Sequence, residues 1–445
     1  MKVAVVGGGL AGIAAALECA DAGADVTLLE GRPRLGGATF SIRRDGIWMD
    51  NGQHVFLRCC TEYRRFLERI EATRLTELQS RLSIPVVSPG GRIARIERAR
   101  LPAPAHLLPS LARFPYLSRR DRIGIARAVR PLAKLDLADP ALDRRTFGSW
   151  LRERGQSQAA VDALWNLIVL PTVNLPAAEA SLALSAKVFQ TGLLESAEAG
   201  DIGYAAVPLQ QLHGDTGAEA LQRAGVDVRV RTRVERVERG TSGFSLAWNG
   251  EGVDADAVVL TVPHDDAAGL APEGAIPHAD ELGYLGASPI VNLHVVYDRP
   301  VTDLPFAAGH KTPVQWVFDR TRGTRLERGQ YLAVSLSCAR EYIGQKVEEL
   351  RAQFVPALEQ LFPEAASARV ELFFVTREQR ATFRQGPGTA ALRPGTRTAL
   401  EGLYLAGAWT DTGWPATMEG AVRSGVAAAR EVVGHPDVAE LEVAA

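Results

Sequence analysis

The chain opens with the hydrophobic pattern of a buried strand that leads into a helix. Residues 3 to 6 are an unbroken run of Val and Ala, typical of a strand buried on both faces. Residues 10 to about 22 are rich in Ala and Leu and predict a helix, and a second strand is expected from Asp25 to Leu29. The order strand, helix, strand predicts a parallel sheet of the Rossmann type.

Further elements of the same kind occur far along the chain. Two runs within residues 226 to 237 alternate between apolar and polar positions, as half-buried strands do, and residues 256 to 263 form another apolar strand. Residues 403 to 407 predict a short strand, and a helix rich in small residues is expected from Met418 to about Val433. Other strands are expected at residues 46 to 49, 290 to 297 and 331 to 337.

The turn between the first strand and the first helix carries glycines at nucleotide-binding spacing. Gly7, Gly9 and Gly12 form a G-x-G-x-x-G sequence, in which Gly7 permits a tight turn and Gly12 lets the helix pack closely on the strand. Gly9 allows a pyrophosphate to approach the backbone, and the N-terminus of the helix, at Leu10 and Ala11, faces the phosphates. The pattern predicts a dinucleotide site.

An acidic residue follows at the distance that this site requires. Glu30 ends the second strand, 18 residues after Gly12, where its carboxylate can accept hydrogen bonds from the ribose hydroxyls of an adenosine. An acid at this place disfavours a 2′-phosphate, because the two negative charges repel each other.

The residues after Glu30 favour FAD over NAD. The segment that contains Gly31, Arg32, Gly36, Gly37 and Ala38 resembles an extension found in the superfamily of flavin-containing amine oxidases and phytoene desaturases. The resemblance implies that this loop passes beside the pyrophosphate of FAD. Because no Cys or His lies in a flavin-attachment motif, we expect FAD to be bound non-covalently.

The same resemblance implies further cofactor contacts. The backbone at Val234 would pair with the adenine, and the helix that starts at Met418 and Glu419 would point its N-terminus at the flavin, where its partial positive charge stabilises the reduced anion. The other implied contacts are Gly52, Gln53, Gly407 and Asp411. Two positions depart from the superfamily pattern, since Ala38 replaces a usual arginine and Ala408 a common acid.

We therefore predict an α/β fold with two domains. The Rossmann-type FAD-binding domain would be discontinuous and comprise residues 1–75, 205–270 and 396–435. An α+β substrate domain would take residues 76–204, mainly helical, and residues 271–395, leaving 436–445 as a tail. A chain of 445 residues is too long for one core, since single cores stop growing at roughly 250 to 300 residues.

Segments expected to face the substrate narrow the resemblance. Residues 50–54 and 410–420 look like those of the hydroxysqualene dehydroxylase family, squalene-associated flavoproteins of bacterial hopanoid pathways. The resemblance implies an FAD-dependent oxidoreductase that acts on a long isoprenoid and reduces hydroxysqualene to squalene and water. His54 and Asp50 are the candidate proton donors, because their loop is expected near the flavin. The alternative is that both only position the cofactor.

Composition limits the other possibilities. Lys and Arg number 50 against 52 Asp and Glu, a formal charge of −2, which excludes a globally basic nucleic-acid binder. The four Cys show no metal-ligand spacing and suit a reducing cytoplasm. No second glycine-rich fingerprint is present, so the reductant is expected to be external. Its identity and the oligomeric state stay open.

One stretch is strongly basic. Residues 92–134 contain 11 Lys and Arg but only two acids, Glu97 and Asp121, and apolar side chains and prolines lie between the charges. This pattern is typical of a surface in the headgroup layer of a membrane, and it predicts peripheral attachment to the inner face of the membrane. The alternative is an arginine-rich face exposed to water over a helical core.

Three other functions stay open at this point. A carotenoid- or phytoene-type desaturase would use the same fold oxidatively. An amine or porphyrinogen oxidase would need polar substrate anchors, and none of the five Lys residues lies in a segment that matches the flavin-facing lysine of amine oxidases. A non-enzymatic prenyl-binding relative would carry no bound chromophore.

Overall fold

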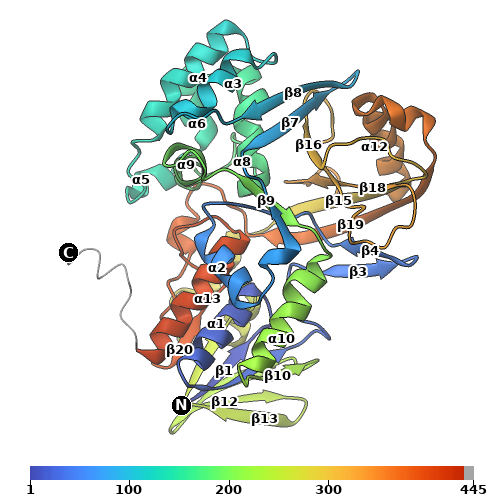
Figure 1. The fold of residues 1–445 in the computed structure, drawn as a ribbon. Coiled ribbons are helices and arrows are strands. Elements are labelled where there is room, and N and C mark those ends of the chain that lie inside the picture. The colour runs from blue at the N-terminus through green and yellow to red at the C-terminus, as the bar shows by residue number, and fades with distance from the viewer. Residues whose placement is uncertain (435–445) are drawn as a thin grey trace.

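The computed structural model describes residues 1–434, which form two regions that lie one above the other in Figure 1. The lower region is built on a parallel sheet with the strand order β10-β2-β1-β14-β20. These strands are β10 (Asp227–Val230), β2 (Asp25–Glu30), β1 (Lys2–Val6), β14 (Ala257–Leu260) and β20 (Leu403–Leu405). The predicted α/β fold class is confirmed, and the tail predicted at 436–445 lies outside the described residues.

Helices cover one face of this sheet. They are α1 (Leu10–Asp21), α2 (Thr61–Arg69), α10 (Thr216–Arg223) and α13 (Met418–Val433). The two long helices α1 and α13 touch closely, because a Cβ atom at Gly425 would lie only 2.1 Å from the carbonyl oxygen of Ala11. This close packing fixes the position of α13 relative to the glycine-rich turn before α1.

The other face carries a small antiparallel sheet and a short helix. The elements are β11 (Arg236–Gly240), β12 (Gly243–Trp248), β13 (Glu251–Ala255) and α11 (His264–Leu270). Their apolar side chains share a buried cluster with Val6 and Leu29. The strand predicted at residues 233 to 237 begins only at Arg236, because the chain turns at Arg231, where φ is +57°.

The upper region contains a seven-stranded sheet in the order β19-β15-β18-β17-β16-β7-β8 (Figure 1). Its strands are β19 (Val370–Thr382), β15 (Ser288–Tyr297), β18 (Gln330–Leu336), β17 (Trp316–Asp319), β16 (Phe306–Gly309), β7 (Ser83–Ser88) and β8 (Arg92–Glu97). The helix α12 (Val347–Leu361) packs against it. Residues 76–204 were expected to be mainly helical. Instead, β7 pairs with β16 and β8 pairs with β7, so both strands belong to this sheet, in which β7 is almost wholly buried.

Between β8 and β9, residues 76–204 contain a group of helices. They are α3 (Leu108–Arg113), α4 (Arg119–Leu132), α5 (Pro140–Asp143), α6 (Phe147–Glu153), α7 (Gln158–Ala160), α8 (Asn166–Val173) and α9 (Leu182–Phe189). Their core is aromatic, with Phe147, Trp165 and Phe189 in mutual ring contact. Within residues 1–434, none of the helices is both long and apolar enough to cross a lipid bilayer.

Short strands lie between the two regions. They are the hairpin β3 (Ser41–Arg44) and β4 (Ile47–Asp50), and a three-stranded sheet of β5 (Val55–Leu57), β9 (Ile202–Ala205) and β6 (Thr76–Leu78). Because β5 follows directly on the loop that holds His54, this small sheet sets the position of that loop.

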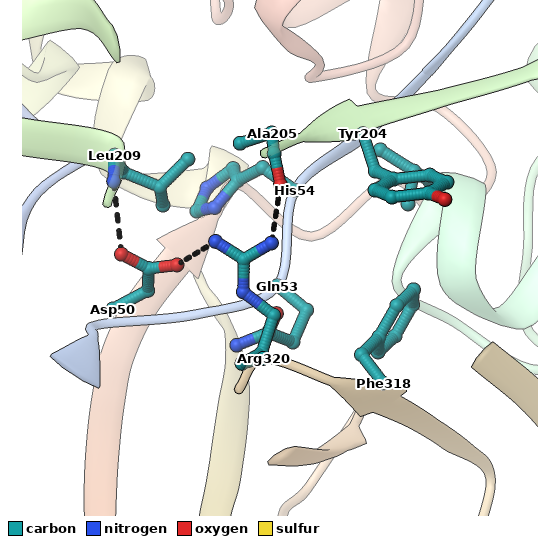
Figure 2. Close-up of a pocket in the computed structure, with 9 residues that line it drawn as sticks. Asp50, Gln53, His54, Tyr204, Ala205, Leu209, Phe318 and Arg320 are labelled. Atoms are coloured by element: carbon teal, nitrogen blue, oxygen red, sulfur yellow. Dashed lines mark hydrogen bonds and ion pairs between the residues drawn. The ribbon is translucent and has the colours of Figure 1, made fainter. Parts of the chain in front are cut away.

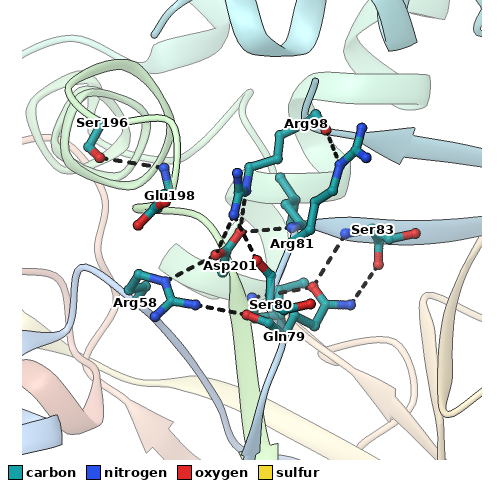
Figure 3. A network of polar contacts seen from close by, with 11 residues as sticks. Arg58, Gln79, Ser80, Arg81, Ser83, Arg98, Ser196, Glu198 and Asp201 are labelled. Atoms are coloured by element: carbon teal, nitrogen blue, oxygen red, sulfur yellow. Dashed lines mark hydrogen bonds and ion pairs between the residues drawn. The ribbon is translucent and has the colours of Figure 1, made fainter. Parts of the chain in front are cut away.

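A buried carboxylate holds this junction together. Asp201 is wholly buried at the start of β9 and pairs with Arg58 at 3.0 Å and with Arg98 at 2.8 Å (Figure 3). It also accepts a hydrogen bond from the backbone N–H of Leu82 at 2.7 Å. Arg58 follows β5 and Arg98 follows β8, so one side chain joins the His54 strand to the edge of the upper sheet.

Replacing Asp201 by Asn should destabilise the protein by about 3 to 5 kcal/mol, because two guanidinium groups lose their buried counter-charge. The control Asp45→Asn removes an exposed partner of Arg44 and should change the free energy of unfolding by less than about 0.5 kcal/mol. Urea denaturation of both variants checks this. Equal, small effects would show that the Asp201 cluster contributes little to the junction.

Candidate functional site

The turn after β1 presents free backbone donors. Gly9 is the N-cap of α1 and offers no side-chain cap, so the N–H groups of Leu10 and Ala11 have no acceptor within residues 1–434. A Cβ atom at Gly12 would lie 1.9 Å from the carbonyl oxygen of Gly7, which explains why this position is glycine. A helix N-terminus with free N–H groups is a binding site for phosphate.

The second glycine pair lies directly against the first turn. The N–H of Gly36 donates to the carbonyl oxygen of Gly8 at 2.9 Å. A Cβ atom at Gly37, where φ is +57°, would lie 2.7 Å from Cα of Gly9. The structure therefore brings the two glycine loops into backbone contact.

The ribose-binding acid is held at the edge of the glycine turn. Glu30 is buried, and its two carboxylate oxygens accept the backbone N–H groups of Gly8 and Arg32, each at 2.7 Å. A carboxylate oxygen has two acceptor positions, so one stays available on each oxygen for a ribose hydroxyl. Gly31 lies against Arg233, and Val234, the predicted adenine contact, is buried beside Leu29, the residue before Glu30.

Two arginines lie beside the alanine that replaces the usual arginine. Nη1 of Arg32 and Nη1 of Arg34 both donate to the carbonyl oxygen of Gly37, at 3.2 and 3.3 Å, next to Ala38. The guanidinium of Arg34 lies 3.6 Å from the centre of the Phe40 ring. Burial, together with the charge of Arg32, lowers the pKa of Arg34 to about 10, so it stays charged at pH 7.

The N-terminus of α13 has free backbone N–H groups, whereas the side chain of Glu419 points toward α2. Thr417 caps the helix by accepting from the N–H of Gly420 at 3.2 Å, while the N–H groups of Met418 and Glu419 have no acceptor among the described residues. The Glu419 carboxylate is turned toward α2, where it accepts the N–H of Tyr63 at 2.7 Å. It also pairs with Arg423 at 2.6 Å, and burial raises its pKa.

The loop between β20 and α13 contains two residues that were predicted to contact FAD, Gly407 and Asp411, and they lie in different surroundings. The N–H of Gly407 donates to Oγ of Ser424 at 2.7 Å, which ties the end of β20 to α13. Asp411 is exposed, and its carboxylate accepts the N–H of Gly413 at 3.2 Å. The structure therefore turns the Asp411 carboxylate into the solvent-exposed part of this loop, whereas Gly407 lies in the interior.

The candidate catalytic acid Asp50 is fully engaged by the protein. Its carboxylate pairs with Nη2 of Arg320 at 2.9 Å and accepts a hydrogen bond from the N–H of Leu209 at 2.9 Å (Figure 2). It also accepts a hydrogen bond from Oγ of Ser41 at 2.6 Å. Arg320 also donates to the carbonyl oxygens of Ala205 and Val207. These contacts engage both carboxylate oxygens of Asp50 and hold it between the hairpin and Arg320.

Asn51 joins the glycine loop to the upper sheet. Its side-chain amide donates to the carbonyl oxygen of Ala38 at 2.9 Å and accepts the N–H of Phe40 at 3.1 Å. Its own carbonyl oxygen accepts from Asn292 on β15 at 3.0 Å and from Thr376 on β19 at 2.9 Å. Gly52 and Gln53 follow directly, so the predicted flavin contacts are held between the two regions.

His54 lies between polar and apolar side chains. Its Nδ1 is 3.3 Å from the carbonyl oxygen of Gly52, and burial lowers its pKa, a shift that the charge of Asp50 partly opposes. The imidazole is therefore mostly neutral at pH 7. It lines a cavity of about 10 Å³ together with Gln53, Tyr204, Phe318 and Arg320.

The fit to FAD rests on the chain's own groups. Two helix N-termini with free N–H groups suit the phosphates of FAD. A glycine contact that admits no side chain suits the close approach of the pyrophosphate, and a buried acid beside the turn suits the ribose. The structure adds Asn51, Asn292 and Arg320 to the predicted site. Asn51 stood inside a recognised segment, but nothing in the local sequence marks the other two, which meet the loop only through the fold.

Comparisons with known proteins show the family to which the chain belongs. The family model described as flavin containing amine oxidoreductase matches residues 10–433. A zeta-carotene desaturase of Synechocystis sp. is 26% identical over 98% of this chain and 98% of its own length. A 15-cis-phytoene desaturase of Solanum lycopersicum is 26% identical over 97% of this chain and 78% of its own length.

Solved structures share the fold. A putrescine oxidase has a TM-score of 0.75 at 20% identity and is matched over 97% of this chain and 99% of its own. Cyclohexylamine oxidase from Brevibacterium oxydans has a TM-score of 0.71 at 20% identity and is matched over 99% of both chains.

The fold and the dinucleotide site thus define a flavoprotein of the amine oxidase type. The chain belongs to the family of flavin containing amine oxidoreductases, and it is an oxidoreductase that uses FAD.

Glu30→Ala and Gly9→Val should each weaken FAD binding at least about tenfold, the first by removing charge-assisted hydrogen bonds and the second by placing methyl groups between the two glycine loops. The control Gly269→Val adds the same side chain at a helical position with nothing within 4 Å. FAD content is measured by absorbance after acid precipitation, which should release the non-covalent cofactor. Full FAD content in both variants would contradict the assignment of this site.

Proposed function

We propose that the protein removes the hydroxyl group of hydroxysqualene, using electrons held by FAD, and releases squalene and water in hopanoid biosynthesis. The observation that carries this proposal is the composition of the cavity beside the predicted flavin contacts. Polar side chains, Gln53, His54 and Arg320, line it together with the apolar Leu209 and Phe318. The cavity, about 10 Å³ in volume, has room for one oxygen atom, and its mixed walls suit the hydroxyl end of a long hydrocarbon.

The chemistry needs few protein groups. FAD, when bound and reduced, supplies the hydride that replaces the oxygen on carbon. The chain must then bind the isoprenoid, exclude water and deliver a proton to the departing oxygen. We assign the delivery of this proton to His54, and the Asp50–Arg320 pair to holding the His54 loop.

A second function has a specific observation in its favour. The relatives that match over 97 to 98% of this chain are named as zeta-carotene and phytoene desaturases, which supports a long isoprenoid as substrate. A desaturase would remove hydride from the substrate instead of adding it. A hydrocarbon offers no partner to Arg320 or Gln53, which is why we favour the hydroxylated substrate.

Purified enzyme with reduced FAD should convert hydroxysqualene to squalene without oxygen, and the rate should rise as pH falls below 7. The lowered pKa of His54 leaves the imidazole mostly neutral at pH 7, so a lower pH increases the protonated fraction that can act as acid. His54→Ala should lower kcat by about 10² to 10⁴-fold and flatten this pH profile. Product analysis by gas chromatography measures the rates.

Two results would count against these roles. Desaturated products from phytoene, with no conversion of hydroxysqualene, would assign the desaturase function. Near-normal kcat in His54→Ala with an unchanged pH profile would show that His54 only positions the cofactor.

We further propose that the enzyme attaches to anionic membranes through the segment 92–134. Four of the eight large apolar side chains that are more than a third exposed in residues 1–434 lie in this segment: Ile93, Leu101, Leu108 and Ile123. Exposed arginines flank them, among them Arg119 and Arg120 on α4. Three other apolar residues of this segment, Leu111, Phe114 and Leu117, are buried and pack inside the group of helices.

The protein should sediment with anionic liposomes at low salt and be released at high salt, since each basic residue near such a surface contributes about 1 kcal/mol. Reversing Arg119 and Arg120 to Glu, together with Ile123→Ser, should abolish most of the binding. The control reverses Arg236 and Arg328, which are exposed elsewhere on the protein. Equal binding of both variants would show that this segment is not the membrane contact.

A further inference from the structure

The cavity beside His54 contains two donors that the protein leaves without acceptors. Nε of Arg320 and Nε2 of Gln53 are both buried, and neither has a hydrogen-bond partner within residues 1–434. Both side chains line the same cavity, where Figure 2 shows them next to each other below His54. Buried N–H groups are normally paired, so these two mark a place that stabilises an acceptor atom.

The size of the cavity limits that acceptor. Its volume of about 10 Å³ is close to what a single water-sized oxygen requires, roughly 10 to 15 Å³. Val55, Leu209 and Phe318 form apolar walls around it. A lone oxygen on a hydrocarbon chain fits such a place, whereas a carboxylate or a phosphate is too large.

The charge around the cavity limits the acceptor further. Arg320 is 8% exposed, and Asp50 balances its positive charge through Nη2 at 2.9 Å. Nε is a separate atom from the paired Nη2, and its N–H has no acceptor within residues 1–434. A balanced pair attracts a full anion only weakly, but its N–H still binds a hydroxyl oxygen and the partial negative charge that develops as that oxygen departs.

We propose that Arg320 and Gln53 form an oxygen site, which binds the hydroxyl group of the substrate and then holds the water that leaves. This inference rests on the dehydroxylation proposed above. The C–O bond breaks with its electron pair on oxygen, and the oxygen takes one proton from His54 to become water. The carbon receives a hydride supplied by reduced FAD, and solvent returns a proton to His54. The oxygen site therefore selects hydroxylated isoprenoids over the corresponding hydrocarbons.

The test compares two ligands on two variants of the oxidised flavoprotein. Gln53→Met removes the donor at similar volume, and no hydrogen bond of the Gln53 side chain to the protein is lost. Gln158→Met, at an exposed helical position, is the matched control. Dissociation constants of hydroxysqualene and squalene in detergent micelles are measured from changes in the visible flavin spectrum. Arg320→Lys is a second variant, because it keeps the charge and removes the Nε–H.

The wild type and Gln158→Met should bind hydroxysqualene about fivefold or more tightly than squalene, as one or two hydrogen bonds allow. Gln53→Met should reduce this ratio to near one by weakening only the alcohol. An unchanged ratio in Gln53→Met would overturn the oxygen site and assign the donors to a structural water. Preferential binding of the alcohol without turnover would keep the oxygen site and reject the dehydroxylase function, so the two proposals fail separately.

Discussion

The buried ion pair between Asp50 and Arg320 joins the two regions of this protein at the place where the chemistry is proposed. Asp50 ends the hairpin that follows the glycine loop, and Arg320 follows a strand of the upper sheet. Taking either charge out of water without the other is costly, so neither element can move away alone. The hydrogen bonds of Arg320 to Ala205 and Val207 extend this link to the strand β9.

The Asp201 cluster extends the same arrangement outward. It connects the strand after His54 with the edge of the upper sheet through Arg98, which lies within the basic segment that we propose as the membrane contact. The His54 loop is thus held at both ends, by Asp50 with Asn51 on one side and by Arg58 on the other. Such a loop is suited to preorganised proton transfer, which depends on fixed geometry more than on the strength of any one contact.

Elements of the fold could be predicted from the sequence where they depend on residues close together along the chain, and not where they depend on distant ones. The strand β1, the helix α1 and the helix α13 follow from local periodicity and glycine spacing, and α13 was predicted with its observed bounds. The placement of β7 and β8 in the upper sheet was missed, because it depends on pairing with β16, more than 200 residues away.

The candidate site divides in the same way. The positions of Glu30 and the glycines around the first turn were predictable, because they follow from spacing within adjacent turns. The engagement of Asp50 by Arg320, 270 positions further along the chain, and the turning of Glu419 toward α2 were not, since both depend on tertiary contacts. Arg32 and Arg34 reach the carbonyl oxygen of Gly37, next to Ala38, from within the same loop, a contact that the sequence pattern did not reveal.

The direction of electron flow is the central claim, because dehydroxylation and desaturation differ in whether the flavin gives or takes a hydride. Stopped-flow mixing without oxygen tests it directly, with the visible absorbance of the flavin as the signal. Reduced enzyme mixed with hydroxysqualene should regain the oxidised spectrum, with one squalene formed per flavin. A flavin that stays reduced with hydroxysqualene, while oxidised enzyme is reduced by phytoene, would contradict the account.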